Sequence, residues 1–82
     1  MKILEQNRGI HILEQKNGYQ IKLNVELLTD PGRWFIYNDS FTFWHKPENL
    51  PMTEKERLTI IRKIKDFYQD GLLVFEGDYN DK

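Results

Sequence analysis

The aromatic segment RWFIYNDSFTFWHKP, residues 33–47, constrains the fold of this chain more than any other feature. Seven of its fifteen residues carry aromatic rings when the imidazole of His45 is counted. The alternation predicts two strands, 33–38 and 41–45, joined by a tight turn, with bulky rings on both faces of the pair. One helix covers only one face of a sheet. We therefore expect either a core closed from both sides or a partly exposed aromatic surface.

A second alternating segment, residues 19–27, predicts a strand with one buried face, because apolar residues occupy every second position. Asn17 and Gly18 precede it and form a strong hairpin signal, since both residues tolerate positive φ. Residues 10–15 are then the expected partner strand, and residues 3–6 a further strand before it. The first half of the chain is thus predicted to be mostly β.

Residues 53–70 carry the clearest helix signal. Thr53 is placed as an N-cap, and Glu56 lies three residues on, which is the spacing of a capping box. Gly71 stands where a C′ glycine is expected, and the apolar run 72–76 predicts a final strand. The predicted core-facing stripe of the helix is Leu58, Ile60, Ile61, Ile64, Phe67 and Tyr68.

These elements predict one α+β domain over residues 1–82, mostly β up to residue 52 and with a frayed tail at residues 77–82. The expected architecture is a single-layer, twisted, mostly antiparallel sheet of five to six strands with one helix packed on one face. A chain of this size buries only about 60–65% of the surface that its unfolded form exposes, so a deep catalytic cleft is not expected.

Charge and composition narrow the class of protein further. Twelve basic and thirteen acidic residues leave a net charge of −1, which argues against a nucleic-acid binder, because phosphate binding needs a basic excess. The absence of cysteine excludes disulfides and cysteine-based zinc sites and favours a reducing compartment. Residues 1–9 lack the apolar stretch of a signal peptide, and no run approaches a membrane span. We expect a cytoplasmic protein.

Catalytic and metal-binding patterns are missing from the sequence. His11 and His45 are the only histidines, and they lie too far apart to suggest a zinc site. Ser40 is the only serine and falls in the predicted turn without a histidine at a suggestive spacing. Asp30 and Asp39 fall in turn sequences, where aspartates usually support the backbone. We therefore predict no metal, no cofactor and no enzymatic activity.

A protein-binding surface is the sharper interpretation of the aromatic segment, beside the plainer one in which core packing accounts for most of the rings. Tyrosine, tryptophan and arginine dominate interface energetics, and surrounding charges steer a partner. The candidate partner-binding residues are Asp30, Arg33, Tyr37, Asp39, Trp44, Glu48 and Asp78.

The order of these features is similar to a known family. An aromatic strand RWFIY (33–37) precedes a strand that ends at Trp44. A proline loop, a helix TxxExxxIIxxI (53–64) and an apolar strand after Gly71 follow. Over residues 19–76 this order resembles the small α+β immunity proteins of bacterial polymorphic-toxin and contact-dependent growth inhibition systems.

The resemblance implies a cytoplasmic protein that binds the C-terminal domain of a cognate toxin, often a nuclease, and neutralises it by stoichiometric occlusion. It implies no catalytic residues. The alternative function is a small protein-interaction adaptor or accessory subunit, with nucleic-acid or small-ligand binding behind it. An unprotected sheet edge can pair with a second copy, so we expect a monomer or a weak homodimer without a membrane partner.

Overall fold

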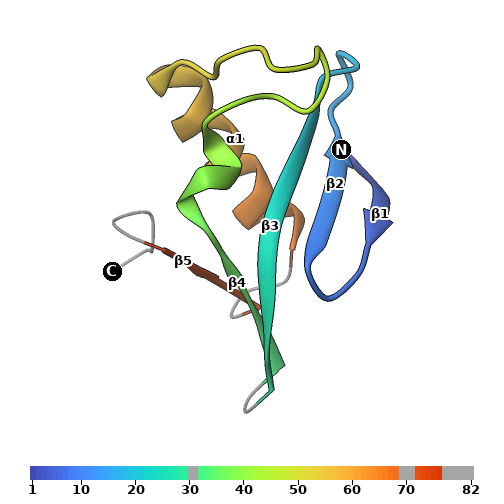
Figure 1. Cartoon of the computed structure of the whole chain (residues 1–82), viewed down its shortest axis with the longest axis vertical. Coiled ribbons are helices and arrows are strands. Elements are labelled where there is room, and N and C mark those ends of the chain that lie inside the picture. The colour runs from blue at the N-terminus through green and yellow to red at the C-terminus, as the bar shows by residue number, and fades with distance from the viewer. Residues whose placement is uncertain (30–31, 69–71, 77–82) are drawn as a thin grey trace.

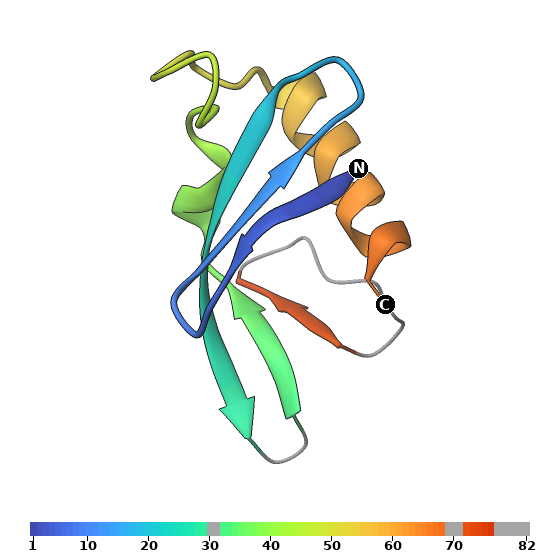
Figure 2. The ribbon, with the colours of Figure 1, turned by 90° about the vertical axis from the view of Figure 1, so that its right-hand side faces the viewer.

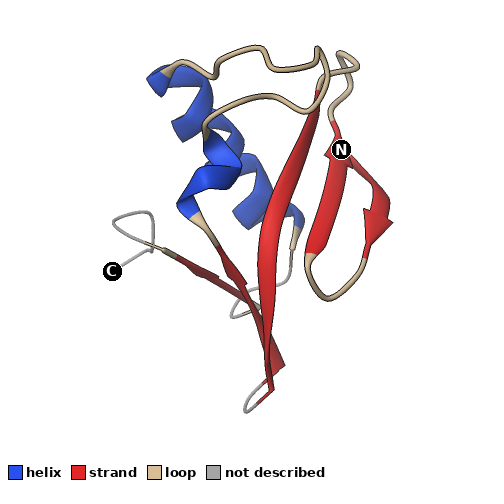
Figure 3. Ribbon diagram, in the orientation of Figure 1, coloured by secondary structure: helices blue, strands red, loops and turns tan. Residues whose placement is uncertain are grey.

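The computed structural model describes residues 1–29, 32–68 and 72–76, and within them it forms one open sheet with one α-helix (Figures 1 and 3). The strand order is β1-β2-β3-β4-β5, antiparallel except for the last pair. This confirms the expected α+β class. The elements in chain order are β1 (Lys2–Gln6), β2 (Ile10–Glu14), β3 (Gln20–Thr29), β4 (Gly32–Ile36), a 3₁₀ helix η1 (Asn38–Phe41), α1 (Glu54–Phe67) and β5 (Leu73–Phe75).

The β2–β3 hairpin forms as the sequence predicts. Gly18 adopts φ +90°, a conformation that suits glycine, and its N–H donates to the carbonyl of Gln15 at 3.0 Å. The Asn17 side chain accepts a hydrogen bond from the backbone N–H of Tyr19 at 3.0 Å. The resulting register sets Leu13 opposite Ile21, so that both side chains enter the core.

The predicted strand at residues 41–45 is wrong. The chain turns through η1 instead, where Ser40 N–H donates to the carbonyl of Tyr37 at 3.1 Å and the Phe41 side chain enters the core. Residues 42–52 then fold back on themselves, with isolated bridges joining Phe43 to Pro51 and Lys46 to Gln20. The place beside β4 is taken by β5, which pairs with it in parallel.

Helix α1 has the capping box that the sequence predicts. Thr53 Oγ1 accepts from Glu56 N–H at 3.1 Å, and Glu56 Oε1 accepts from Thr53 N–H at 2.9 Å. The helix ends at Phe67 rather than residue 70, and Gly71 lies outside the described residues. Two members of the predicted apolar stripe are wrong, because Leu58 is 52% exposed and Phe67 is 41% exposed.

The core lies between α1 and one face of the sheet, and Figure 2 shows the helix along that side. The opposite face of β3, β4 and β5 carries no helix among the described residues. The buried apolar residues are Leu13, Ile21, Leu23, Val25, Ile36, Phe41, Trp44, Met52, Ile60, Ile61, Ile64, Tyr68 and Phe75. The uncovered outer face is therefore the natural place to look for a binding surface.

Candidate functional site

Tyr37 lies on this outer face, immediately after β4. Its hydroxyl donates to Glu26 Oε1 of β3 at 2.8 Å, and its ring meets the edge of Phe35 at a centroid distance of 5.1 Å. The strand register explains the contact, since Glu26 is paired with Phe35. Strand alternation thus gathers a carboxylate and two aromatic rings on the face that α1 leaves open.

One carboxylate contacts the Tyr37 hydroxyl, and the charges of two more act on it. The hydrogen bond to Glu26 is the main cause that raises the pKa of Tyr37, and the charges of Glu26, Glu76 and Asp39 add to it. Asp39 Oδ1 accepts from Asn24 Nδ2 at 3.0 Å, and Glu76 Oε1 accepts from the backbone of Asn38 at 2.8 Å.

We call these four residues, Glu26, Tyr37, Asp39 and Glu76, the Tyr37 cluster. Within residues 1–29, 32–68 and 72–76, none of its carboxylates forms an ion pair. The carboxylates of the cluster therefore have no direct cationic partner there, although Lys22 and Lys46 line the hollow that adjoins Asp39.

A hollow of about 510 Å³ adjoins the Tyr37 cluster and shares Asp39 with it. Phe43, which is 50% exposed, and the exposed Glu48 lie on its rim. The two features meet at Asp39, so a partner that covers the cluster can also reach the hollow. The lining residues are Lys22, Asn24, Asp39, Ser40, Phe43, Trp44, His45, Lys46, Glu48 and Asn49.

Trp44 differs from the expectation of an exposed ring, since it is only 4% exposed. Tyr19 packs edge-on against it, with ring centroids 5.2 Å apart. The reason is the return of residues 42–52 to the beginning of β3, which pulls the indole into the core. Trp44 lines the hollow as a wall and offers little area to a partner.

The remaining predicted site residues do not all join this surface. Arg33 is half-buried on β4. It lies on the same face as Phe35 and Tyr37, because alternate residues of a strand point to the same side. Its Nε is buried and has no hydrogen-bond partner among the described residues. Asp30 and Asp78 lie outside the residues that the structure describes. The structure thus brings Tyr37, Asp39 and Glu48 to the cluster and its hollow, while Arg33 lies on the same sheet face further along β4.

His11, considered in the sequence analysis only as a metal ligand, is a polar residue of the core. It is fully buried, and its Nδ1 lies 2.8 Å from the hydroxyl of Tyr68 at the end of α1. Trp34 contacts the imidazole edge-on at 4.3 Å between centroids. Burial lowers the pKa of His11, and a smaller effect of the Asn7 backbone raises it. Burial raises the pKa of Tyr68 to about 12.

The structure contains little that supports catalysis. Among the described residues, no group of three or more His, Asp or Glu side chains could hold a metal ion. The Ser40 hydroxyl accepts from the backbone N–H of Asn24 at 2.8 Å and is buried, so it serves the fold. Over the same described ranges, no helix has the length and apolar character needed to cross a membrane.

The fold is that of a small α+β protein with an uncovered sheet face, and a comparison with known families identifies its class. Residues 7–76 match the family model described as Immunity protein 74. The chain therefore belongs to the Immunity protein 74 (Imm74) family. No curated protein and no solved structure matches it.

Family membership confirms the resemblance to small immunity proteins of toxin–immunity systems. The partner of such a protein is a toxin, and families of this kind are typically not enzymes. The match begins at residue 7, so it covers β2 to β5 and α1 but leaves out β1. The Tyr37 cluster and its hollow fall entirely within the matched region.

Proposed function

We propose that this protein binds the C-terminal domain of a cognate toxin stoichiometrically and blocks the toxin's active site or a surface that the toxin needs. The face that makes the contact is the Tyr37 cluster with its adjoining hollow. Protection of this kind requires a long-lived complex, and affinity among related complexes is tuned mainly through the dissociation rate. We propose a cytoplasmic setting and a contact-dependent growth inhibition system for it.

The observation that carries this choice of face is a half-buried tyrosine that donates to Glu26, with the charges of Asp39 and Glu76 also acting on it and no ion pair to any of the three among the described residues. Tyrosine is favoured at energetically important interface positions because it buries a large area and keeps a polar tip. Unbalanced carboxylates attract a basic partner and exclude an acidic one. The Tyr37 cluster therefore suits a cationic toxin surface.

A nuclease is the toxin class that this charge suits best. An enzyme that acts on nucleic acid needs Lys and Arg side chains around its active site to bind phosphates. An acidic immunity face can occupy that same surface. Occlusion and electrostatic complementarity then coincide, and the immunity protein needs no chemistry of its own.

Co-expression tests the proposal. The chain is produced with the C-terminal domain of the large protein encoded next to it, and growth and co-purification are measured. Rescue of growth with a one-to-one complex supports neutralisation by binding. Absence of both contradicts it and favours the adaptor alternative.

The face is tested with a double variant, Glu26→Gln with Asp39→Asn. Both substitutions keep the acceptor oxygens that Tyr37 and Asn24 use, so the fold is retained while two charges are lost. The matched control is Glu5→Gln with Glu54→Gln, which removes the same charge from β1 and the beginning of α1.

The loss of a charge partner at an interface costs about 2–5 kcal/mol, so we expect the Kd of the cluster variant to rise by about 30-fold or more. The control variant should keep the affinity of the original protein. Equal affinity for the cluster variant and the original chain would show that the toxin binds elsewhere.

A further inference from the structure

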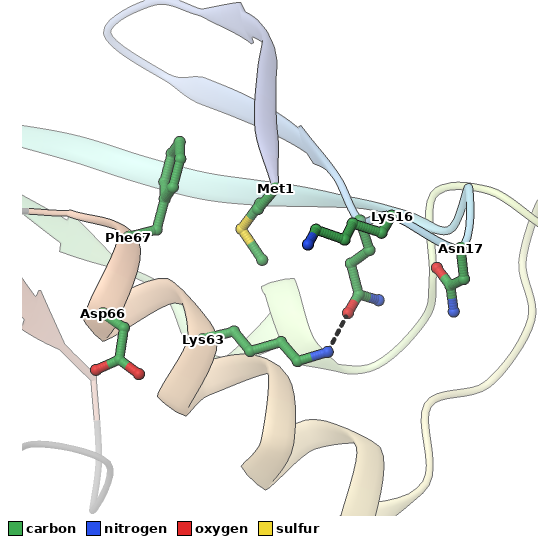
Figure 4. Close-up of a pocket in the computed structure, with 7 residues that line it drawn as sticks. Met1, Lys16, Asn17, Lys63, Asp66 and Phe67 are labelled. Atoms are coloured by element: carbon green, nitrogen blue, oxygen red, sulfur yellow. Dashed lines mark hydrogen bonds between the residues drawn. The ribbon is translucent and has the colours of Figure 1, made fainter.

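A second surface, unrelated to the Tyr37 cluster, lies where the β2–β3 turn approaches α1. Two hollows of about 560 Å³ and 340 Å³ adjoin there, because Gln15 and Asn17 of the turn line both of them. Figure 4 shows the larger one, with the side chains of Met1, Lys16 and Lys63 extending toward one opening. Lys63 Nζ donates to Gln15 Oε1 at 3.1 Å across it. We call these two neighbouring hollows together the groove.

One stripe of α1 forms the helical wall of the groove. Lys55, Thr59, Lys63 and Phe67 follow one another at i, i+4 spacing, so they lie along one side of the helix. All four are exposed, although they border the β2–β3 turn. The stripe spans about 18 Å, the rise of twelve helical residues. Such a length matches a short extended peptide.

The charges along the groove are mainly positive. Lys16, Lys55 and Lys63 line it, and within the part of the chain that the structure describes none of them forms an ion pair. Glu56 also lines it, and its Oε1 accepts the backbone N–H of Thr53 in the capping box. This hydrogen bond lowers the pKa of Glu56 and keeps it ionised, so its negative charge partly offsets the three lysines. Asp66 is the other carboxylate on the wall.

Apolar groups lie beside these charges. The Phe67 ring is 41% exposed and shares the larger hollow with the half-buried Met1. In the smaller hollow, Tyr19 and the buried Trp44 form the wall next to Ile60. The groove therefore offers apolar contacts next to lysines that lack carboxylate partners.

From this arrangement we infer that the groove binds an acidic polypeptide segment that carries an aromatic or aliphatic side chain. Its carboxylates contact Lys16, Lys55 and Lys63, and its apolar side chain packs between Met1 and Phe67. A nucleic acid suits the groove less well, because the chain as a whole carries a net charge of −1 and phosphate binding needs a basic excess. This site goes beyond the toxin contact proposed above and does not depend on it.

An NMR titration of the ¹⁵N-labelled full chain tests the inference without any toxin. The probe is a blocked hexapeptide of four glutamates, one phenylalanine and one leucine. Two comparison peptides replace the glutamates by lysines or the phenylalanine by alanine. A twelve-residue oligothymidylate serves as the nucleic-acid probe.

We expect saturable shifts of the amide signals of Lys16, Asn17, Lys63 and Phe67 with the acidic peptide. The alanine peptide should bind more weakly, and the lysine peptide should not bind there. The double variant Lys16→Gln with Lys63→Gln should weaken binding about 2- to 10-fold, since each exposed charge pair contributes little. The control Arg8→Gln with Arg62→Gln removes the same charge from outside the groove and should leave binding unchanged.

Several outcomes would overturn the inference. These are shifts spread over the whole surface, equal weakening by both double variants, or no shift at millimolar peptide. Tighter binding of the oligothymidylate at the same residues would assign the groove to nucleic acid instead. Both double variants replace exposed side chains, and their amide spectra without peptide show directly whether the fold is retained.

Discussion

The buried contact between His11 and Tyr68 allows a quantitative test of how the sheet is joined to the helix. The Tyr68 hydroxyl and His11 Nδ1 are 2.8 Å apart, and the two rings are stacked at 6.0 Å with only 5° between their planes. Tyr68 is the C-cap of α1, while His11 is the second residue of β2. The substitution Tyr68→Phe removes the hydroxyl and keeps the ring.

The size of the expected loss of stability depends on which hydrogen bonds the imidazole of His11 keeps after the substitution. His11 Nε2 is already buried without a hydrogen-bond partner among the described residues, so Tyr68→Phe leaves both ring nitrogens unpaired. A buried polar group that loses its partner costs about 1–3 kcal/mol. For a domain of this size each kcal/mol lowers Tm by about 4–8 °C. We expect a clear loss of stability with an unchanged circular dichroism spectrum.

A double-mutant cycle separates the hydrogen bond from general packing. Replacing both partners by apolar groups is often nearly neutral, so His11→Leu should recover much of the stability that Tyr68→Phe alone loses. Urea unfolding at pH 7.5, followed by far-UV circular dichroism, measures all four proteins. Additive effects of the two substitutions, or a cost of Tyr68→Phe below about 0.5 kcal/mol, would refute the reasoning.

Three further predictions concern stability and use the same urea assay. Burial lowers the pKa of His11 below its usual 6.5. The contribution of the neutral imidazole to stability is therefore complete above pH 6.5, and the free energy of unfolding declines as the pH falls below this value. A His11→Leu variant should lack this decline. Thr53→Ala removes the acceptor for Glu56 N–H and should cost about 1 kcal/mol, whereas Thr53→Ser should cost little. Gly18→Ala should lower the free energy of unfolding by about 1–2 kcal/mol because alanine disfavours the positive φ of this position. A steric clash does not contribute, since a Cβ there meets no atom within 4 Å.

The elements that could be predicted from the sequence are those fixed by local physics. The capping box requires only that Glu56 follow Thr53 by three residues. The β2–β3 turn requires only a residue that tolerates positive φ, which is Gly18. Neither requires knowledge of distant contacts. Both are found where the sequence places them, although α1 ends three residues earlier than predicted.

The predicted strand at residues 41–45 does not form, because contacts with a distant part of the chain decide the structure there. Its aromatic residues have strong strand propensity, but propensity of this kind measures how well a side chain fits a half-buried sheet. Here the edge of β4 is occupied by β5, which comes from more than thirty residues further along the chain. Phe41 instead packs against Phe75 of that same strand, with ring centroids 6.1 Å apart. Competition between distant segments decided the outcome.

The burial of His11 could have been found from the sequence. In β2, isoleucines alternate with His11 and Leu13, so the strand alone does not show which face is inside. The hairpin register does show it, since directly opposite residues share a face of the sheet. His11 is paired with Leu23, and Leu13 with Ile21, on the clearly alternating strand β3. The face that holds His11 is therefore the core face.

The Tyr37 cluster could be predicted only in part, for a reason that also bears on how an immunity protein changes its partner. Tyr37 and Asp39 are near in sequence, but Glu26 joins them through antiparallel pairing and Glu76 through the parallel pairing of β5. Three separate elements thus supply the charge, and all three carboxylates lie outside the hydrophobic core. Each can be substituted without altering core packing. On our proposal the charge of this face, and with it the choice of toxin, can therefore change one residue at a time while the fold stays the same.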